Sequence, residues 1–350
     1  MTIRMLILGT GGMARAHAAA FADIDGVELV AGVDTDAKRV ADFNDAFAIP
    51  NAFTSLDDAI AWGEFDAVAN VTPDAIHHVT TMALLAAGKH VLCEKPLAAN
   101  YADAAEMAAA AEKAGVVNMV NLTYRNVAAL NKAADMVAKG EIGAVRHFDA
   151  SYLQSWLTQD SWGAWDKESQ WLWRLSTAHG SNGTLGDVGI HILDFATFIA
   201  GSDAADVSAR LKTFDKAPGN QIGEYTLDAN DSVAMHVGLE NGAIGVIHAT
   251  RFASGHINDL RLQIFGTKGG LDVQFENHNS RLRASIGDDM PSGTWRDIET
   301  PEVHTNYQKF IAAIKAGSMG SPDFARGADL QKVLDLAVQS DALNGQTLPV

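Results

Sequence analysis

The sequence predicts a chain of two parts: an α/β part built on a doubly wound parallel sheet, residues 1–123, and an α+β part, residues 124–350, with a large, mostly antiparallel sheet. Three observations predict this fold class. In the first third of the chain, short β-branched apolar runs alternate with helical stretches, and a glycine-rich turn follows the first run. Beyond about Tyr124, successive strands are joined by hairpin turns. The length of 350 residues agrees with two domains.

The first part alternates strands and helices in regular order. Strands are expected at residues 3–8, 27–33, 66–71, 90–93 and 116–122, with helices at 13–22, 36–47, 75–87 and 101–114. A further helix, running toward Trp62, is expected to begin at a capping box formed by Ser55 and Asp58. Helices of this length between strands are the crossover connections that parallel strands require, so the sheet is predicted to be parallel.

The second part has a different rhythm. A helix at residues 127–139 precedes a strand at 145–153, a long irregular segment follows, and a second helix spans 187–200. Hairpins are expected at 231–239 with 243–252, around Asn241-Gly242, and at 259–265 with 271–275, followed by a strand at 281–286. The tail returns to helix from about residue 305, and packing against the first part is one option for it.

Composition excludes several classes of protein. The chain has 26 basic and 43 acidic residues, a net charge of −17. The charge is spread over both parts, with no basic lobe that would follow a phosphate backbone, so we expect no nucleic-acid partner. Cys93 is the single cysteine, which excludes an internal disulfide and a cysteine-built metal centre. Without a signal-peptide pattern or a membrane-spanning apolar run, a soluble cytoplasmic protein is expected.

A glycine-rich turn lies between the first strand and the first helix. Residues 9–14 read Gly-Thr-Gly-Gly-Met-Ala, the GxGxxA pattern of a dinucleotide-binding Rossmann domain. Asp34 ends the second strand, where a carboxylate can accept hydrogen bonds from the adenosine ribose; the alternative is that Asp34 only caps the following helix. The turn and the acid predict a cofactor site containing Gly9, Gly11, Gly12, Met13 and Asp34. Asp34 favours NAD over NADP, although Lys38 and Arg39 lie close in sequence.

Two segments carry side chains suited to chemistry. Glu94-Lys95-Pro96 follows the predicted strand 90–93, at the sheet edge where ligands bind in such folds; the alternative is a surface lysine. In the apolar helix 187–200, Asp187, His191 and Asp194 recur at i, i+4 and i+7 on one stripe. Polar groups on a buried helix need partners, which are either a ligand or other protein groups, such as an arginine paired with Asp194.

Taken together, the turn at 9–14, Glu94-Lys95-Pro96 and the segment from Gly183 to His191 resemble the Gfo/Idh/MocA family of oxidoreductases, which includes glucose–fructose oxidoreductase and inositol dehydrogenases. The likeness covers nearly the whole chain. It implies that Lys95, Asp187 and His191 form the catalytic set. It also places Thr72, Pro73 and His77 on the nicotinamide ribose side, and we assign Glu94 and Lys95 to the cofactor site as well. Ser181-Asn182-Gly183 stands where many members carry three glycines.

The expected reaction is oxidation of a secondary alcohol. His191 takes the hydroxyl proton, Lys95 holds the alkoxide oxygen, and Asp187 orients a substrate hydroxyl. The expected substrate is a sugar, sugar derivative or cyclitol. The alternatives are a non-catalytic NAD-binding regulatory protein of the same fold and an NADP(H)-linked sugar reductase. No metal is expected, and the broad antiparallel sheet, with the family resemblance, predicts a homodimer or homotetramer.

Five of the seven tryptophans lie between Trp156 and Trp173, just before the catalytic segment. One interpretation is a pocket wall that packs on a sugar, with Trp173 and Arg174 contacting the substrate. The alternative is a satellite core or a subunit interface. Arg125, after the last parallel strand, is a further predicted substrate contact.

Overall fold

The computed structural model describes residues 2–160 and 162–350. It forms two compact units, each described here by itself. The first unit comprises Met1–Thr123 and His304–Gln331, and the second comprises Tyr124–Val303 and Lys332–Val350. The residues of helix α10 (Phe324–Ala342) are divided between the two units. Within the described residues, no helix has the length and apolar character needed to cross a membrane.

The first unit is built on a sheet of six parallel strands in the order β3-β2-β1-β4-β5-β6. Their bounds are β1 Ile3–Leu8, β2 Val27–Val33, β3 Asn51–Phe53, β4 Ala67–Asn70, β5 His90–Cys93 and β6 Asn118–Val120. The order reverses at β1, so the chain winds outward in both directions from the middle of the sheet. This confirms the predicted doubly wound parallel sheet; the short edge strand β3 was not predicted.

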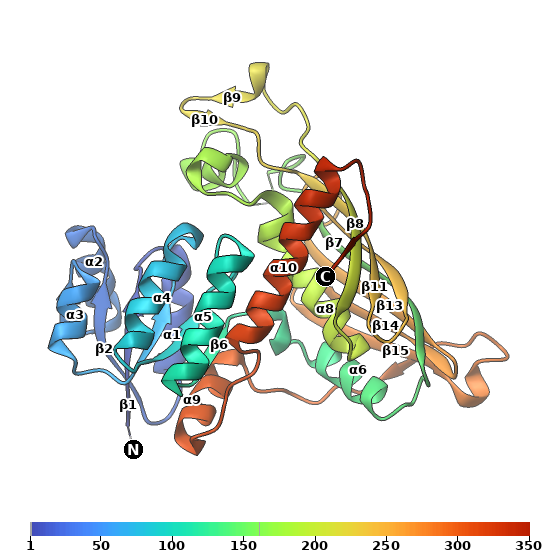
Figure 1. Ribbon diagram of the computed structural model, residues 1–350, viewed down its shortest axis with the longest axis horizontal. Helices are drawn as coiled ribbons and strands as arrows, with labels where there is room; N and C mark the ends of the chain where they lie inside the picture. Colours follow the sequence, from blue (N-terminus) through green and yellow to red (C-terminus); the bar gives the residue numbers. More distant parts are fainter. Residues whose placement is uncertain (1, 161) are drawn as a thin grey trace. The chain divides into compact units, whose positions relative to one another are not determined.

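Helices connect these strands (Figure 1). They are α1 Gly12–Ala22, α2 Ala37–Phe47, α3 Leu56–Trp62, α4 His77–Ala86, α5 Tyr101–Ala114 and, from the tail, α9 Asn306–Ala316. Side chains cap four of their N-termini, with Asp36 on α2, Ser55 on α3, Asn100 on α5 and Thr305 on α9. Gly115 ends α5 in the left-handed conformation, with a φ of 63°.

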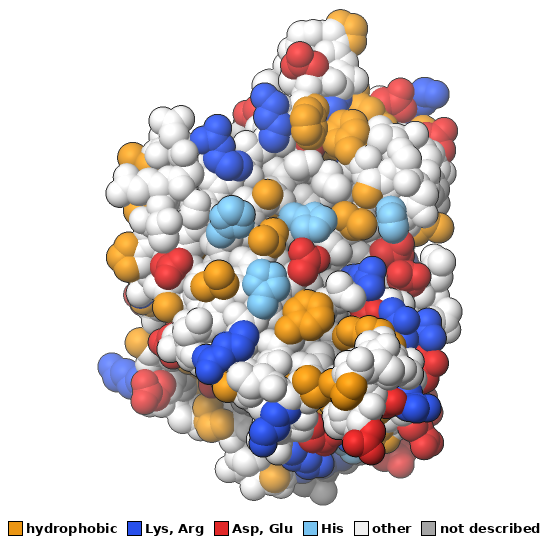
Figure 2. Space-filling model, turned by 90° about the vertical axis from the view of Figure 1, so that its right-hand side faces the viewer, with side chains coloured by type: hydrophobic (Ala, Val, Ile, Leu, Met, Phe, Trp, Pro, Cys, Tyr) orange, Lys and Arg blue, Asp and Glu red, His pale blue; other side chains and the backbone are white. Residues whose placement is uncertain are grey.

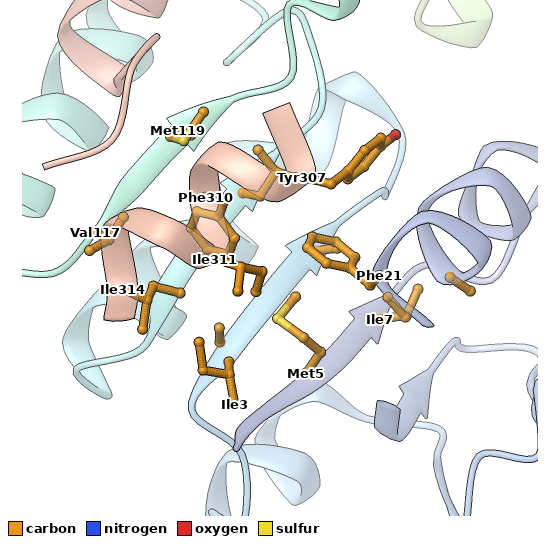
Figure 3. Close-up of a cluster of buried hydrophobic side chains, with 14 of the residues drawn as sticks. Ile3, Met5, Ile7, Phe21, Val117, Met119, Tyr307, Phe310, Ile311 and Ile314 are labelled. Atoms are coloured by element: carbon orange, nitrogen blue, oxygen red, sulfur yellow. The ribbon is translucent and has the colours of Figure 1, made fainter. Parts of the chain in front are cut away.

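The tail helix α9 belongs to the core of this unit (Figure 3). Tyr307, Phe310 and Ile314 lie with Phe21 of α1 over one face of the sheet, against Met5 and its neighbours on β1. Because strand side chains alternate between the two faces, Cys93 of β5 points to the opposite face, where Thr81 of α4 contacts its sulfur. Both faces are therefore covered, as a parallel sheet requires.

The second unit is built on a nine-stranded sheet in the order β16-β15-β14-β13-β7-β12-β11-β8-β17. Its strands are β7 Val145–Gln154, β8 Ala204–Lys212, β11 Ser232–Leu239, β12 Ile244–Thr250, β13 Asn258–Gly266, β14 Gly269–Glu276, β15 Asn279–Ile286, β16 Arg296–Ile298 and β17 Leu348–Pro349. All neighbours are antiparallel except β7 and β12. The predicted antiparallel sheet is confirmed, and the Asn241-Gly242 turn joins β11 to β12.

Several strands of the second unit were not predicted: β8, β16 and β17 of the large sheet, and the short pair β9 and β10. Strand β8 has alternating apolar and polar residues, but they follow a helix and no hairpin turn, so nothing in its own sequence pairs it with β11. The short pair β9 Gln221–Ile222 and β10 Tyr225–Thr226 forms a separate small sheet. The pairing of β8 with β11, which is distant in the sequence, depends on tertiary packing rather than on local propensity.

Helices α6 (Ala128–Ala138) and α8 (Ile190–Ala200) pack on one face of the large sheet. The other face carries the outward positions of the strands, among them His147 on β7, His236 on β11 and His248 on β12. Figure 2 shows histidine and hydrophobic side chains together on the surface at this side of the molecule. This outer face also carries ion pairs, in which Arg261 of β13 and Arg283 of β15 contact Asp272 of β14.

Candidate active site

The glycine-rich turn of the first unit leaves room beside the main chain. Gly9 has a φ of 83°, and a Cβ there would lie 2.7 Å from the Val71 carbonyl oxygen, so the fold itself requires this glycine. A Cβ on Gly11 or Gly12 would meet no heavy atom within 4 Å. These two glycines therefore keep open a space at the N-terminus of α1, where no side chain caps the helix. Free amides at a helix N-terminus fit a pyrophosphate group.

Asp34, at the end of β2, is tied to this turn. Its Oδ2 accepts hydrogen bonds from the Thr10 amide (2.9 Å) and the Thr10 hydroxyl (3.0 Å). Its Oδ1 accepts one from the Asp36 amide at 3.0 Å and one from Arg39 Nη1 at 3.1 Å. Burial opposes the charge, but these hydrogen bonds and Arg39 hold the pKa of Asp34 below its ordinary value. The alternative that Asp34 caps the following helix is wrong, because Asp36 does so.

The loop after β4 is held by buried side chains. Asn70 Oδ1 accepts hydrogen bonds from the Thr72 hydroxyl (2.7 Å) and the Thr72 amide (3.3 Å). His77 is fully buried, and its Nδ1 and Nε2 each lie 2.8 Å from a main-chain carbonyl oxygen, those of Pro96 and Thr72 respectively. The predicted cofactor contact through the His77 side chain is therefore wrong, because both ring nitrogens bind the protein's own backbone.

The Glu94 side chain is likewise held by protein groups. Its Oε1 lies 2.7 Å from His17 Nε2 of α1 and accepts a hydrogen bond from Asn121 Nδ2, also at 2.7 Å. Its Oε2 accepts one from the Lys95 amide at 3.1 Å. Burial opposes the charge, but the contacts to His17 and Asn121 and the nearby Lys95 lower the pKa of Glu94 to about 2. Glu94 anchors the main chain beside Lys95 within the protein interior, and its predicted contact with the cofactor is not supported.

In the second unit, the predicted helix 187–200 does not begin as a regular α-helix. Residues Leu185–Gly189 form a π-helical turn, and α8 starts at Ile190. The wider turn changes the angle between Asp187 and the residues that follow. Asp187 and Asp194 also have different partners, because Arg174 and Arg251 hold Asp187 whereas Arg125 holds Asp194. A π-turn inside a helix often marks a functional position.

Asp187 is held by two arginines. Arg174 Nη1 lies 3.2 and 3.1 Å from its two carboxylate oxygens, and Arg251 Nη2 lies 2.9 Å from Oδ2. The Arg251 side chain is fully buried and also donates to the Arg174 carbonyl at 3.1 Å. Arg251 was not predicted, because it follows strand β12, far from Asp187 in sequence, and has no motif around it. The carboxylate remains partly exposed and is positioned by both guanidinium groups.

His191 is buried against tyrosine rings. Tyr124 meets it edge-on, with ring centroids 5.0 Å apart, and Tyr152 lies at 6.5 Å. The two tyrosine hydroxyls hydrogen-bond to each other, and Asn258 donates to Tyr124 at 2.8 Å and accepts from Tyr152 at 2.7 Å. Sequence reasoning missed both tyrosines and Asn258, which come from three separate segments. They fix the ring of His191 from one side by packing.

Arg125 and Asp194 form a buried ion pair with each other. Arg125 Nε and Nη2 donate to the two Asp194 oxygens at 2.6 and 2.7 Å, and the guanidinium lies 3.5 Å from the centroid of the Phe198 ring. The alternative for Asp194, pairing with an arginine, is confirmed. The predicted substrate contact through Arg125 is not supported, because its guanidinium is buried and holds Asp194 and the following turn of α8.

The tryptophan-rich segment forms a satellite core. Trp156 is buried with Leu157, Leu172, Leu175 and Leu227, and Trp162, Trp165 and Trp171 pack around them. Arg174 lies 4.8 Å from the Trp173 ring, which is half-buried. Nearby, a pocket of about 280 Å³ is lined by Trp162, Ile257, Asn258, Asn277 and His278. Most tryptophans of the segment are thus core, which agrees with the satellite-core alternative, and Trp162 also borders a pocket.

Three features define the first unit as a nicotinamide-dinucleotide-binding domain of an oxidoreductase. They are the glycine turn, the open N-terminus of α1 and Asp34 at the end of the second strand. Residues 3–122 match the model of the oxidoreductase family with an NAD-binding Rossmann fold, and residues 130–272 match that of the GFO/IDH/MocA C-terminal domain. The chain belongs to the GFO/IDH/MocA family of oxidoreductases, and the predicted resemblance is confirmed.

Curated relatives extend over nearly the whole chain. A levoglucosan dehydrogenase of Pseudarthrobacter phenanthrenivorans is 26% identical, covering 96% of this chain and 95% of its own length. A scyllo-inositol 2-dehydrogenase (NADP(+)) of Bacillus subtilis is 31% identical, covering 96% of each chain. The relatives therefore include both sugar and cyclitol dehydrogenases.

Solved structures agree over the full length. An oxidoreductase domain protein from Kribbella flavida has a TM-score of 0.88 at 31% identity, covering 100% of this chain and 99% of its own. Levoglucosan dehydrogenase in complex with NADH and levoglucosan has a TM-score of 0.87 at 25% identity, with the same coverage. These similarities confirm the fold class and the NAD-binding character of the family.

Proposed function

We propose that the protein oxidises a secondary hydroxyl of a sugar, sugar derivative or cyclitol with NAD as the hydride acceptor. The observation that carries the proposal is Asp187, a carboxylate held by Arg174 and Arg251 in a π-turn that leads directly to His191. A protein that only bound NAD would have no use for this arrangement. The proposal is further supported by the sugar and cyclitol dehydrogenases among the relatives.

Proton removal falls to His191 in this mechanism. Imidazole is the usual general base near neutral pH, and the packing of Tyr124 and Tyr152 against His191 limits the orientations of its ring. Asp187 accepts a hydrogen bond from a substrate hydroxyl and offsets the positive charge that His191 gains. Because Arg174 and Arg251 fix the carboxylate, this interaction requires little reorganisation during the reaction.

Lys95 is proposed to hold the substrate oxygen while its proton leaves, since an ammonium group lowers the cost of the developing alkoxide. The open space at Gly11 and Gly12 fits the pyrophosphate of a dinucleotide, and Asp34 fits its adenosine ribose. Bound NAD supplies the acceptor for the hydride that leaves the carbinol carbon. Thr72 and Pro73, in the loop after β4, are proposed to lie beside the nicotinamide ribose.

The substrate class follows from the relatives and from the second unit. Tryptophan faces pack well on the C–H faces of a sugar ring, and Trp173 and Arg174 are proposed as substrate contacts beside Asp187. With a net charge of −17, the protein does not repel a neutral polyol, whereas an anionic sugar would need a local cationic pocket.

Use of NADP is the second candidate, and a specific contact favours it. Arg39 pairs with Asp34 at 3.1 Å and is half-exposed, and an arginine at this position accommodates the 2′-phosphate of NADP in related folds. One relative carries NADP(+) in its name. We place NAD first because Asp34 is ionised and its charge would oppose a phosphate.

We also propose that the protein acts in the cytoplasm as a homodimer or homotetramer, without a nucleic-acid partner. The outer face of the large sheet, with His147, His236 and His248 among apolar positions, is the proposed subunit contact (Figure 2). Light scattering at micromolar concentration tests this, and a monomer would contradict it.

The function itself is tested by a substrate panel. Purified protein is incubated with NAD⁺ or NADP⁺ and single sugars, anhydrosugars or inositols, and reduction is followed at 340 nm. We expect turnover with at least one neutral polyol and a preference for NAD⁺. Tight NADH binding with no turnover on the whole panel, in either direction, would favour the non-catalytic alternative instead.

A further inference from the structure

We propose that His77 is a positioning residue of the active site, whose imidazole joins the loop after β4 to the loop after β5 and so fixes the main chain at Lys95. The proposal rests on the catalytic role proposed for Lys95. In this proposal the His77 side chain acts by holding main-chain carbonyls, and not by the direct cofactor contact that its sequence position suggested.

The geometry places His77 between two functional loops. Strands β4 and β5 are neighbours and end side by side, with Asn70 paired to Cys93. The chain leaves β4 through Thr72 and leaves β5 through Lys95. His77, the first residue of α4, contacts the Thr72 carbonyl through Nε2 and the Pro96 carbonyl through Nδ1, each at 2.8 Å. One side chain thus spans both loops.

Both contacts require a proton on the ring nitrogen. Carbonyl oxygens only accept hydrogen bonds, and a neutral imidazole carries a single N–H, so satisfying both carbonyls requires the imidazolium form. Burial opposes this charge, but Cys93 of β5, Asp74 of the preceding 3-10 turn and the Pro96 carbonyl raise the pKa of His77 to about 10. The ring therefore keeps both contacts throughout the neutral pH range.

Lys95 is fixed from both sides as a result. Its own amide donates to Glu94, at 3.1 Å, and the carbonyl of the next residue, Pro96, accepts from His77. The Thr72 loop is likewise held by Asn70 on one side and His77 on the other. The main chain near Lys95 therefore has little freedom, and a displacement of about 1 Å at a reacting group can cost on the order of 10²-fold in rate.

The neighbouring His78 supplies a matched control. It lies on the same helix, is partly exposed, and contacts Glu106 of α5 through Nε2 at 2.9 Å. Substituting His78 changes a histidine at almost the same place in the chain without touching either loop. Comparing the His77 and His78 variants therefore distinguishes the positioning role of His77 from a general structural need for histidine at the start of α4.

The first experiment needs no substrate. The parent protein is labelled with ¹⁵N in its histidine rings, and the His77 signals are assigned by their loss in His77→Gln. We expect both His77 nitrogens to remain protonated at pH 7 and pH 8. A bare ring nitrogen on His77 at pH 7 would overturn the proposal, whether or not any sugar is oxidised.

The second experiment compares His77→Phe, His77→Gln and His78→Gln with the parent, using the best substrate of the panel. Phe fills the space without donors, and Gln keeps one donor. We expect kcat to fall about 10- to 100-fold in His77→Phe, with a smaller change in the KM for the sugar, an intermediate value in His77→Gln, and less than about a twofold change in His78→Gln.

A folded His77→Phe or His77→Gln variant with the parent's kcat would overturn the positioning role. If His77→Phe does not fold, His77→Gln and the parent's ¹⁵N spectrum decide. If the parent oxidises no member of the panel, the proposed function fails, and the protonation state of His77 is still settled by the spectrum.

Discussion

The glycine turn of the first unit and the Asp187 segment of the second are both proposed ligand sites, and they are formed by opposite means. At the turn, absent side chains make the site: Gly11 and Gly12 leave space, and the main-chain amides face it. Around Asp187, side chains make the site: Arg174 and Arg251 come from distant segments to hold one carboxylate. A site made by the main chain can be recognised from a short sequence motif, whereas a site made by side chains forms only when the tertiary fold brings distant residues together.

Substitutions of Asp187 and Asp194 have the largest expected effects in the second unit. Asp187→Asn weakens its pairing with both arginines and removes the charge proposed to act on substrate, so we expect kcat to fall by about 10²–10⁴. Asp194→Asn leaves the buried Arg125 without its partner charge, so we expect the protein to lose about 3–5 kcal/mol of stability.

Steady-state kinetics and urea unfolding of both variants separate these effects. Turnover per folded Asp194→Asn molecule stays close to that of the parent. Equal losses of turnover in both variants would show that Asp187 has no role of its own in the reaction.

Acid stability tests the buried carboxylate beside Lys95. The pKa of Glu94 is lowered to about 2 in the folded protein, below its unfolded value. The stabilisation is therefore complete above the unfolded pKa and is lost as pH falls through about 2. We expect Glu94→Gln to flatten the pH dependence of unfolding below about pH 4.5, where the parent loses about 3 kcal/mol. An unchanged slope in the variant would remove Glu94 as the anchor of this loop.

Two glycines of the turn have different reasons to be glycine. Gly9→Ala forces a Cβ to within 2.7 Å of the Val71 carbonyl at positive φ, so we expect a loss of about 1–3 kcal/mol in folding free energy. Gly11→Ala meets no protein atom, so we expect near-parent stability and NADH affinity lowered by about tenfold. Thermal unfolding and NADH fluorescence titration measure both. Parent-like NADH affinity in Gly11→Ala would mean that the pyrophosphate does not approach this glycine.

The smallest expected effects concern cofactor choice. Asp34→Ser removes the acceptor for the ribose hydroxyls, so we expect NADH affinity to fall by a factor of about 3–10. Arg39→Ala removes the guanidinium beside Asp34, so we expect any NADP⁺ turnover to fall while NAD⁺ turnover changes by less than about twofold. An NADH affinity that rises in Asp34→Ser would contradict the ribose contact.

Sequence reasoning was strongest where a feature is local. The alternation of strands and helices in the first unit, the cap at Ser55 and the glycine turn at 9–14 depend on neighbouring residues, and the structure has them where the sequence placed them. Reasoning failed where a feature depends on distant partners. The roles predicted for His77, Glu94 and Arg125 assumed that a polar group near a site faces the ligand, whereas burial directs each of them to the protein's own carbonyls, amides or carboxylates.

The π-turn at Leu185–Gly189 is another feature that local sequence reasoning did not predict. Counting residues at 3.6 per turn placed Asp187 and Asp194 on one stripe of a regular helix, but a π-turn precedes α8 and the two carboxylates have different arginine partners. Arg251 and Asn258 carry no sequence signal at all, since only the fold brings Arg251 to Asp187 and Asn258 to the tyrosines that pack on His191.

The most direct test of the proposed reaction is a single-turnover measurement on His191→Ala, with NAD⁺ and the best polyol of the panel, followed at 340 nm. We expect the rate of NADH formation to fall by about 10²–10⁴ while the Kd for NADH stays within about twofold of the parent, because His191 acts on the hydroxyl proton and not on the cofactor. NADH formation at the parent's rate in His191→Ala would contradict its role as the base.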